Sequence, residues 1–319
     1  MPIAPTTFVH EVSVIARTHL ADDVVELVLR STNQTPLPQW EPGAHIDLVM
    51  EPGLVRQYSL CGDPTNPLTY RIAIRREHDG RGGSVRAHQL NVDDVTTIRG
   101  PRNHFSLYDS SAYVFVAGGI GITPIIPMIR RADANRLPWR LHYMGRSRSS
   151  MPYLSELAEL DRGRGNVHIL PSSEFGRARI EHLLTPTDVG STVYSCGPGT
   201  LLHAVEDASK MIGLSCYTER FTAQVNDDVV DVPFVTRLAA SGIDLLVPAD
   251  RTLLDILIDA DIDVSTSCEE GTCGSCEVPV IDGVPDHRDT VLTAEERASC
   301  DRILVCVSRS RTPMIVLDL

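Results

Sequence analysis

The sequence has no long run of uncharged apolar residues. No such run reaches the roughly 18 residues that a membrane-spanning helix needs, and residues 1–10 lack the basic and apolar regions of a secretory signal peptide. Basic residues are also scarce, since 29 Lys and Arg stand against 42 Asp and Glu, for a formal net charge of −13. A surface of that sign disfavours binding to nucleic acid and to anionic membranes. We therefore expect a cytoplasmic protein with no nucleic-acid or membrane partner.

The length and composition indicate several folded domains. Of 319 residues, 42% are apolar and 22% are charged, which excludes the collagen-like, disordered and disulfide-scaffold classes. At roughly 150 residues per domain, the chain is long enough for two or three. Acidic residues gather near the C-terminus, where residues 227–319 contain 19 Asp and Glu against 7 Arg. That asymmetry marks a separate domain, whose acidic surface is either simply solvated or a docking face for a basic partner.

The pattern of apolar residues predicts two kinds of sheet. Between about residues 7 and 107, β-rich runs alternate with Pro/Gly turns, which is typical of an antiparallel barrel. Its strands are expected at 9–15, 24–29, 45–49 and 70–75. Between about residues 112 and 221, apolar strands precede helical segments, which is typical of a parallel α/β sheet. Its strands are expected at 113–117, 141–144 and 192–195, and its helices at 124–131, 153–160 and 201–212.

A third region follows a polar stretch, residues 222–231, that has the composition of a linker. Two strands are expected there, joined by a hairpin-like turn at Ser241 and Gly242, and a helix follows them. The strands are expected at 233–239 and 243–247, and the helix at 252–259. This third region contains most of the cysteines of the chain.

Four of these cysteines have the spacing of an iron–sulfur site. A C-x4-C-x2-C pattern is followed, after 29 further residues, by the fourth; they are Cys268, Cys273, Cys276 and Cys306. Thiolates are the ligands of iron–sulfur clusters, and this spacing is that of plant-type [2Fe–2S] ferredoxins. Gly271 and Gly274 let the backbone curl round a cluster and direct N–H groups at its sulfurs. A structural zinc site and a chance grouping of buried thiols are the alternatives, and Cys300 is predicted to be structural.

A second group of residues suits the phosphate of a flavin. Arg56 can pair with the anion through two hydrogen bonds, and the turn at 82–84 can offer N–H groups to the phosphate oxygens. Two neighbours of Arg56 suit the ring system, since Tyr58 can pack along it and Ser59 can reach its N5 atom. An ordinary β-strand is the alternative for residues 56–59.

A third group suits a pyrophosphate at a turn between a strand and a helix. Glycines recur in residues 116–124, and the arrangement is repeated at 194–199, about 75 residues later. Glycine lets a pyrophosphate approach the backbone at a helix N-terminus. The spacing departs from GxGxxG, so it does not predict the Rossmann fingerprint. Because ligands bind at the carboxyl ends of parallel strands, we expect both segments at the same edge of the sheet.

Together these motifs resemble the phthalate dioxygenase reductase family, which includes vanillate O-demethylase reductases and lies within the ferredoxin–NADP reductase superfamily. The resemblance covers essentially the whole chain. Its motifs are RQYSLC at 56–61, GRGGS at 80–84, GPRNHF at 100–105, GGIGITP at 118–124, SCGP at 195–198, ERF at 219–221, and the four cysteines. The resemblance implies a multidomain fold with three parts. These are a flavin-binding antiparallel β-barrel domain at 1–108, an α/β parallel-sheet NAD(P) domain at 109–225, and an α+β β-grasp ferredoxin domain at 226–319.

The resemblance also implies the cofactors and their residues. Residues 101–105 look like the FMN-binding branch, so FMN is expected rather than FAD, beside a [2Fe–2S] cluster. The FMN residues are expected to be Arg56, Gln57, Tyr58, Ser59, Ala73, Ile74, Arg75, Gly82, Gly83, Ser84, Thr123 and Phe221. The nicotinamide nucleotide residues are expected to be Gly118, Gly119, Gly121, Pro124, Arg146, Ser147, Cys196, Gly197, Pro198 and Glu219.

The choice between NADH and NADPH depends on the segment after the strand at 141–144. Arg146, Ser147 and Arg148 follow this strand, where the adenosine ribose should lie, and they could hold a 2′-phosphate. Members of the family generally use NADH, so we expect NADH, with NADPH as the alternative. A solvated loop is a further alternative for Arg148.

These parts predict an electron-transfer sequence. A nicotinamide gives two electrons as a hydride and a cluster takes one at a time, so a flavin is needed between them. We predict hydride transfer from nicotinamide C4 to flavin N5, with Ser59, Thr123 and Cys196 positioning the rings. The electrons then pass through the cluster to a terminal oxygenase, of Rieske type or, second, a cytochrome P450, docked on the acidic domain. The alternative is a redox-sensing interaction protein.

Overall fold

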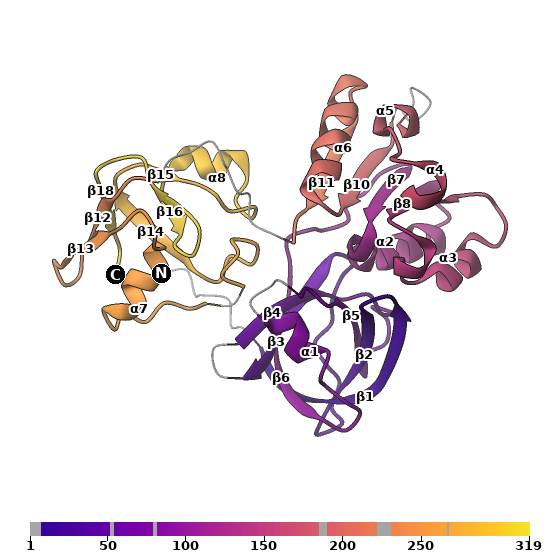
Figure 1. Ribbon diagram of the computed structural model, residues 1–319, viewed down its shortest axis with the longest axis horizontal. Coiled ribbons are helices and arrows are strands. Elements are labelled where there is room, and N and C mark those ends of the chain that lie inside the picture. Colours follow the sequence, from indigo (N-terminus) through magenta and orange to yellow (C-terminus); the bar gives the residue numbers. More distant parts are fainter. Residues whose placement is uncertain (1–7, 52–53, 79–81, 185–189, 222–230, 267) are drawn as a thin grey trace. The chain divides into compact units, whose positions relative to one another are not determined.

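A computed structural model describes residues 8–51, 54–78, 82–184, 190–221, 231–266 and 268–319. The chain divides into two compact units, Met1–Glu219 and Arg220–Leu319 (Figure 1). The first unit contains two separate sheets, which we call the N-terminal lobe and the middle lobe. The predicted linker at 222–231 lies outside the described residues except for Asp231.

The N-terminal lobe is built on a six-stranded antiparallel sheet with the order β4-β3-β6-β1-β2-β5. Its edge strands approach each other, because Leu60 bridges to Ile72 and the Cys61 N–H donates to the Arg71 carbonyl at 2.9 Å. Its elements are β1 (Val9–Ala21), β2 (Val24–Ser31), β3 (Ala44–Glu51), β4 (Leu54–Ser59), β5 (Thr69–Arg75), α1 (Gly83–Ala87) and β6 (Val95–Asn103).

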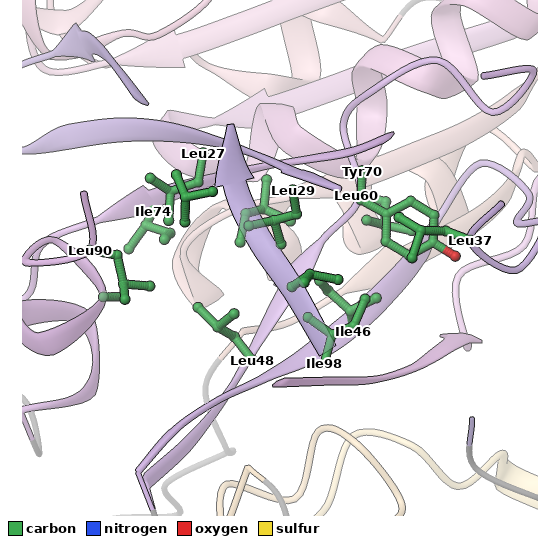
Figure 2. Close-up of a cluster of buried hydrophobic side chains, with 14 of the residues drawn as sticks. Leu27, Leu29, Leu37, Ile46, Leu48, Leu60, Tyr70, Ile74, Leu90 and Ile98 are labelled. Atoms are coloured by element: carbon green, nitrogen blue, oxygen red, sulfur yellow. The ribbon is translucent and has the colours of Figure 1, made fainter. Parts of the chain in front are cut away.

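Apolar and polar residues alternate along these strands, and the apolar side chains fill the interior of the lobe. Along β2, for example, Leu27 and Leu29 are fully buried, and each is followed by a more exposed neighbour. Side chains from six strands and from α1 meet in one cluster, which includes Ile46, Tyr70 and Ile98 (Figure 2). Burial of this apolar surface is the main force that stabilises the lobe.

The middle lobe is a five-stranded, wholly parallel sheet with the order β11-β10-β7-β8-β9. The chain order reverses between β7 and β10, which makes the gap between these two strands the topological switch point of the sheet. The strands are β7 (Tyr113–Gly118), β8 (Trp139–Gly145), β9 (Val167–Pro171), β10 (Thr192–Cys196) and β11 (Ser215–Glu219). The helices are η1 (Gly119–Gly121), α2 (Ile122–Ala134), η2 (Arg148–Ser150), α3 (Leu154–Asp161), α4 (Ser172–Phe175), α5 (Ile180–Leu183) and α6 (Gly199–Met211).

The second unit combines a mixed five-stranded sheet, in the order β13-β12-β18-β14-β16, with a short two-stranded one. Helix α7 begins after Thr252, whose hydroxyl accepts from the Asp255 N–H at 3.1 Å as an N-cap. One apolar core joins the sheet to α7, with Leu257 and Ile315 fully buried. The elements are β12 (Phe234–Leu238), β13 (Asp244–Val247), α7 (Leu253–Asp259), β14 (Glu277–Asp282), β15 (Pro285–Asp286), α8 (Ala294–Ser299), β16 (Arg302–Leu304), β17 (Arg309–Ser310) and β18 (Met314–Leu317).

The elements expected from the sequence are present, with ends that shift by a few residues. The two strands expected around Gly242 pair as β12 and β13, and Gly242 has a φ of 69°, which glycine adopts without strain. Eight strands and four short α-helices were not predicted: β6, β9, β11, β14, β15, β16, β17 and β18, with α1, α4, α5 and α8. In the described part of the chain, no helix is long and apolar enough to cross a bilayer.

Candidate functional site

The four predicted cluster ligands lie together in the second unit. Cys268, Cys273, Cys276 and Cys306 are all free thiols with at most 4% of their surface exposed. Backbone N–H groups point at two of the sulfurs. Those of Glu270 and Thr272 donate to Cys268 Sγ at 3.3 and 3.4 Å, and that of Ser275 donates to Cys273 Sγ at 3.4 Å. Such N–H···S bonds stabilise thiolate charge, which is what an iron–sulfur cluster requires of its loop.

Gly271 gives this loop its shape. It has a φ of 65°, and a Cβ at this position would lie 2.5 Å from the Val307 side chain and 3.1 Å from the Asp289 Cα. The Gly271 carbonyl accepts from the Thr290 N–H at 2.9 Å, which ties the loop to the segment behind it. A side chain at 271 would therefore push the loop away from its support.

The thiols form two hydrogen-bonded pairs. Hydrogen bonding from Cys273, helped by the Glu270 and Thr272 amides, lowers the pKa of Cys268 to about 6, and hydrogen bonding from Cys306 lowers the pKa of Cys276. Among the residues that the structure describes, no three His, Cys, Asp or Glu side chains are arranged to hold a single metal ion. In each pair the pKa of the partner thiol, Cys273 or Cys306, is raised by the same hydrogen bond and by burial. The four buried sulfurs together suit a centre of two irons that takes four thiolates.

The structure brings Arg56 against the predicted phosphate turn. A Cβ on Gly83 would lie 2.4 Å from Arg56 Nε, so the absent side chain is what lets the guanidinium approach the turn. Gly82 precedes α1 with a φ of 77°. The Ser84 hydroxyl accepts from the Glu77 N–H at 2.9 Å, so one of its lone pairs is already in use. Arg81 and Gly80 lie outside the described residues.

Other predicted flavin residues lie on neighbouring strands. Gln57, Tyr58 and Ser59 are on β4, and Ala73, Ile74 and Arg75 are on β5. The Ile74 side chain belongs to the core of the N-terminal lobe, so it offers its backbone alone to a ligand. Phe221 belongs to the second unit, and its place beside the flavin stays a prediction.

The two glycine-containing segments meet at the switch point. β7 and β10 pair through Ala117 and Cys196, which places the loops after them side by side. A Cβ on Gly121 would lie 2.3 Å from the Cys196 carbonyl oxygen, and one on Gly118 would lie 2.8 Å from the Pro198 ring. These glycines therefore serve close packing between the two loops, and their backbone forms the rim of the sheet.

Two further predicted residues, Thr123 and Pro124, also lie at this rim. Thr123 and Pro124 open α2, where the Thr123 hydroxyl donates to the Ile120 carbonyl at 2.9 Å. The Arg75 guanidinium lies 4.0 Å from where a Cβ of Gly119 would be. The predicted flavin strand β5 is thus in contact with the predicted nucleotide turn.

The segment predicted to face the adenosine ribose contains an ion pair that the sequence did not suggest. Arg148 donates to both carboxylate oxygens of Glu174, from Nε at 2.9 Å and from Nη2 at 3.2 Å. Ser147 caps η2 together with Ser150, and the Arg146 carbonyl accepts from the Ser173 N–H. Glu174 is 26 residues away on α4, and no spacing rule links it to Arg148.

Glu219 is a half-buried residue beside Cys196, with one carboxylate oxygen fully buried. The two residues are paired across β11 and β10. Burial raises the pKa of Glu219 to about 8 and, with the nearby Glu219 charge, raises the pKa of Cys196. Among the described residues the Oε2 atom of Glu219 is buried without a hydrogen-bond partner. A carboxyl in this position is protonated at neutral pH and can donate a hydrogen bond to a bound ligand.

The Glu219 carboxyl gives the protein a specific pH dependence. Its pKa is near the ordinary 4.5 in the unfolded chain and about 8 in the fold, so the unfolding free energy decreases as pH rises from about 4.5 to about 8. We expect Glu219→Gln to remove this decrease, which is on the order of 1 kcal/mol or more. Melting curves of the nucleotide-free protein between pH 5 and 9 test this. Glu159→Gln, at an exposed site on α3, is the control and should run parallel to the wild type.

Comparison with known proteins matches both units. The model of the 2Fe-2S iron-sulfur cluster binding domain covers residues 237–311. The phenoxybenzoate dioxygenase subunit beta of Ectopseudomonas oleovorans is 39% identical over 306 residues, which cover 94% of each chain. A solved phthalate dioxygenase reductase is 33% identical with a TM-score of 0.73, and the match covers 98% of both chains. A solved intact type IV self-sufficient cytochrome P450 monooxygenase is 41% identical with a TM-score of 0.85; this chain spans 41% of its length.

A cluster loop, a flavin-type sheet and a nucleotide rim on one chain define an iron–sulfur flavoprotein reductase. More narrowly, the chain belongs to the phthalate dioxygenase reductase family, as its motifs indicated. It is an oxidoreductase of the type that serves oxygenase systems, and it contains a 2Fe-2S iron–sulfur cluster binding domain.

Proposed function

We propose that the chain carries electrons from NADH through FMN and the [2Fe–2S] cluster to a separate terminal oxygenase. The observation that carries the proposal is the cluster loop, in which backbone N–H groups point at buried thiols, on the same chain as the switch-point rim. When bound, FMN takes a hydride from NADH and hands on single electrons, which matches a two-electron donor to a one-electron carrier.

The proposed division of the chain follows the sheets. Edge strands β4 and β5 approach each other at Leu60 and Ile72, which supports a closed β-barrel for the flavin domain at 1–108. The parallel sheet would form the NAD domain at 109–225. The mixed sheet with α7 across it supports a β-grasp ferredoxin domain at 226–319.

We assign the chain's own residues to three tasks. Arg56 and the backbone of 82–84 would hold the FMN phosphate, and β4 and β5 would line its ring. The rim formed by the segments 118–124 and 196–198 would hold the nucleotide, with Glu219 beside it. Ser59, Thr123 and Cys196 would orient the two rings and exclude water from between them.

The Arg148–Glu174 pair supports NADH as the donor. The Glu174 carboxylate already pairs with the Arg148 guanidinium. It also adds negative charge at the place where the 2′-phosphate of NADPH would lie. We expect Glu174→Gln to raise kcat/KM for NADPH roughly tenfold, equivalent to about 1.4 kcal/mol, because Arg148 becomes able to pair with the phosphate. Steady-state rates with each nucleotide measure this. Glu181→Gln, at an exposed site on α5, should change neither rate, and an unaltered NADPH rate in Glu174→Gln would refute the assignment.

A Rieske-type oxygenase is the proposed acceptor. The phenoxybenzoate dioxygenase subunit and the phthalate dioxygenase reductase, which match nearly the full chain, are named for dioxygenases. A cytochrome P450 is the second candidate, because a self-sufficient P450 monooxygenase contains a region similar to this chain. The acidic ferredoxin domain would dock the acceptor, and Glu269 next to Cys268 is an exposed acidic residue close to the cluster.

The proposal is tested by anaerobic titration of the purified protein with NADH and NADPH. NADH should bleach the flavin absorbance first and then produce the electron paramagnetic resonance signal of a reduced [2Fe–2S] cluster. Extraction should release FMN. A protein that is reduced by NADH but does not turn over with cytochrome c or with an oxygenase would be a sensor, and the reductase function would be refuted.

A further inference from the structure

A polar network crosses the boundary between the N-terminal and middle lobes of the first unit. We call it the interlobe clamp. The N-terminal lobe contributes Glu26 on β2, Cys61 after β4, and Arg71 on β5. The middle lobe contributes Arg130 on α2, with Tyr153 and Glu156 at the start of α3. Both lobes lie in one compact unit, so these contacts belong to one folded body.

Glu156 is the centre of the clamp. Its carboxylate accepts from Arg71 Nη1 at 2.9 Å and Nη2 at 3.0 Å, and from Arg130 Nη2 at 2.6 Å. Arg71 thus forms a two-bond pair with a carboxylate from the other lobe, which is the strongest geometry for such a pair. The same guanidinium groups donate back to the N-terminal lobe, from Arg71 to the Cys61 carbonyl at 2.7 Å and from Arg130 to the Gly62 carbonyl at 2.8 Å.

Tyr153 inserts from the middle lobe into the same boundary. Its hydroxyl donates to Glu26 Oε2 at 2.8 Å and lies 3.3 Å from Cys61 Sγ, while the Arg71 guanidinium lies 5.2 Å from its ring centre. Only 6% of the residue is exposed. Its φ of 66° is in the left-handed region, which costs energy for a residue with a side chain. The fold retains this strained residue where its side chain reaches across the boundary.

The clamp is joined to the segments that would position the two rings. Cys61 is two residues after Ser59, and Arg71 is on the strand that continues to Ala73 and Arg75. Arg130 is on α2, the helix that Thr123 opens. The segments that contain Ser59, Ala73 and Thr123 are therefore tied to the Glu156 carboxylate through Arg71 and Arg130.

We propose that the interlobe clamp is a positioning device for hydride transfer, in which Glu156 and Tyr153 fix the distance between the flavin lobe and the nicotinamide lobe. The proposal rests on the proposed function. These residues touch neither ring; they act through the strands and the helix that do. Hydride transfer depends steeply on the approach of two atoms, so loosening the boundary slows the transfer more than it weakens nucleotide binding.

A second ion pair across the same boundary supplies a matched control. Glu41, before β3, pairs with Arg131 on α2, next to Arg130. The Glu41 side chain is 69% exposed, against 21% for Glu156, so solvent screens the outer pair much more. Both Glu41→Gln and Glu156→Gln remove one negative charge from this boundary. Only Glu156→Gln opens the clamp.

The experiment measures flavin reduction in a single turnover, with the FMN-loaded protein and NADH or its 4-deuterated form. We expect Glu156→Gln to lower the limiting rate constant roughly 10- to 100-fold and to enlarge the deuterium isotope effect, with the Kd of NADH changed less than threefold. Glu41→Gln should match the wild type. If Glu156→Gln keeps the wild-type limiting rate, or if its loss lies entirely in the Kd, the clamp is not a positioning device.

Backbone amide exchange gives a second measurement that needs no turnover. The Asp22 N–H donates to the Ser149 carbonyl across the boundary at 2.8 Å, away from the clamp. Its exchange should become faster in Glu156→Gln and stay unchanged in Glu41→Gln. If the wild type is not reduced by NADH, the proposed function fails, and the Asp22 amide still decides whether the clamp holds the lobes. If the Gln variant does not fold, Glu156→Asp replaces it in both experiments. Asp keeps the negative charge on a side chain that is shorter by one methylene, and the same result is expected.

Discussion

Cytochrome c reduction should be lost when Cys273 is replaced by Ser, while ferricyanide reduction by the flavin is retained. Cys273 forms a buried pair with Cys268, and its sulfur accepts the Ser275 N–H. A Ser hydroxyl in its place is a weaker iron ligand than a thiolate. Electrons from NADH then stop at the flavin. Apart from Phe221, the residues proposed to bind the flavin belong to the other unit and are unchanged in this variant. The measurement is the ratio of the two activities in one preparation, with the iron content.

The control for this variant is Cys300→Ser. Cys300 follows α8, is half-buried, and its thiol donates to the Arg297 carbonyl at 3.5 Å rather than to a cluster ligand. We expect its iron content and cytochrome c activity to equal those of the wild type. Cytochrome c reduction that survives in Cys273→Ser, with the iron absent, would show that electrons leave from the flavin and would contradict the proposed order.

NADH should fail to reduce the flavin when Gly121 is replaced by Ala. The added Cβ would lie 2.3 Å from the Cys196 carbonyl oxygen and 2.8 Å from the Gly197 nitrogen, and backbone atoms cannot move aside as a flexible side chain can. The loops after β7 and β10 must separate, which distorts the rim where the nucleotide would bind. We expect kcat/KM for NADH to fall roughly 100-fold or more, with FMN still bound.

Gly165→Ala tests whether any glycine substitution in this lobe has the same effect. Gly165 also has a positive φ, of 77°, but nothing lies within 4 Å of its Cβ position, so the change adds strain without a clash. Its NADH activity should stay within about twofold of the wild type, since strain at one exposed turn costs only about 1 kcal/mol of stability. Equal losses in both variants would show that the lobe is merely unstable.

The sequence is informative where ligands are close along the chain. Three cluster cysteines lie within nine residues, and glycines at the ends of two strands indicated the nucleotide rim, because parallel strands bring their carboxyl ends together. The strands β2, β3 and β5 could be predicted because apolar and polar residues alternate along them.

Contacts between distant segments could not be predicted in this way. Glu174 is on a four-residue helix with no marked periodicity, and nothing in the sequence pairs it with Arg148. Glu156 looks like an ordinary solvated helix residue, yet its partner Arg71 is 85 positions earlier. Strand β6 was missed because Gly100 and Pro101 interrupt it, and both residues usually signal a turn. The raised pKa of the half-buried Glu219 is a result of packing, which the spacing of residues along the sequence does not reveal.

The strand order of the parallel sheet separates the residues proposed to select the coenzyme from those proposed to hold the nicotinamide. The switch-point strands β7 and β10 end in the glycine loops, which we call the inner loops. Arg148 and Glu174 lie in the outer loops, which follow β8 and β9 on the other side of β7. A lineage could therefore alter its choice of coenzyme by substitutions in the outer loops alone, without disturbing the inner loops that we propose hold the nicotinamide. Related reductases with different coenzyme preferences should differ first at those outer positions.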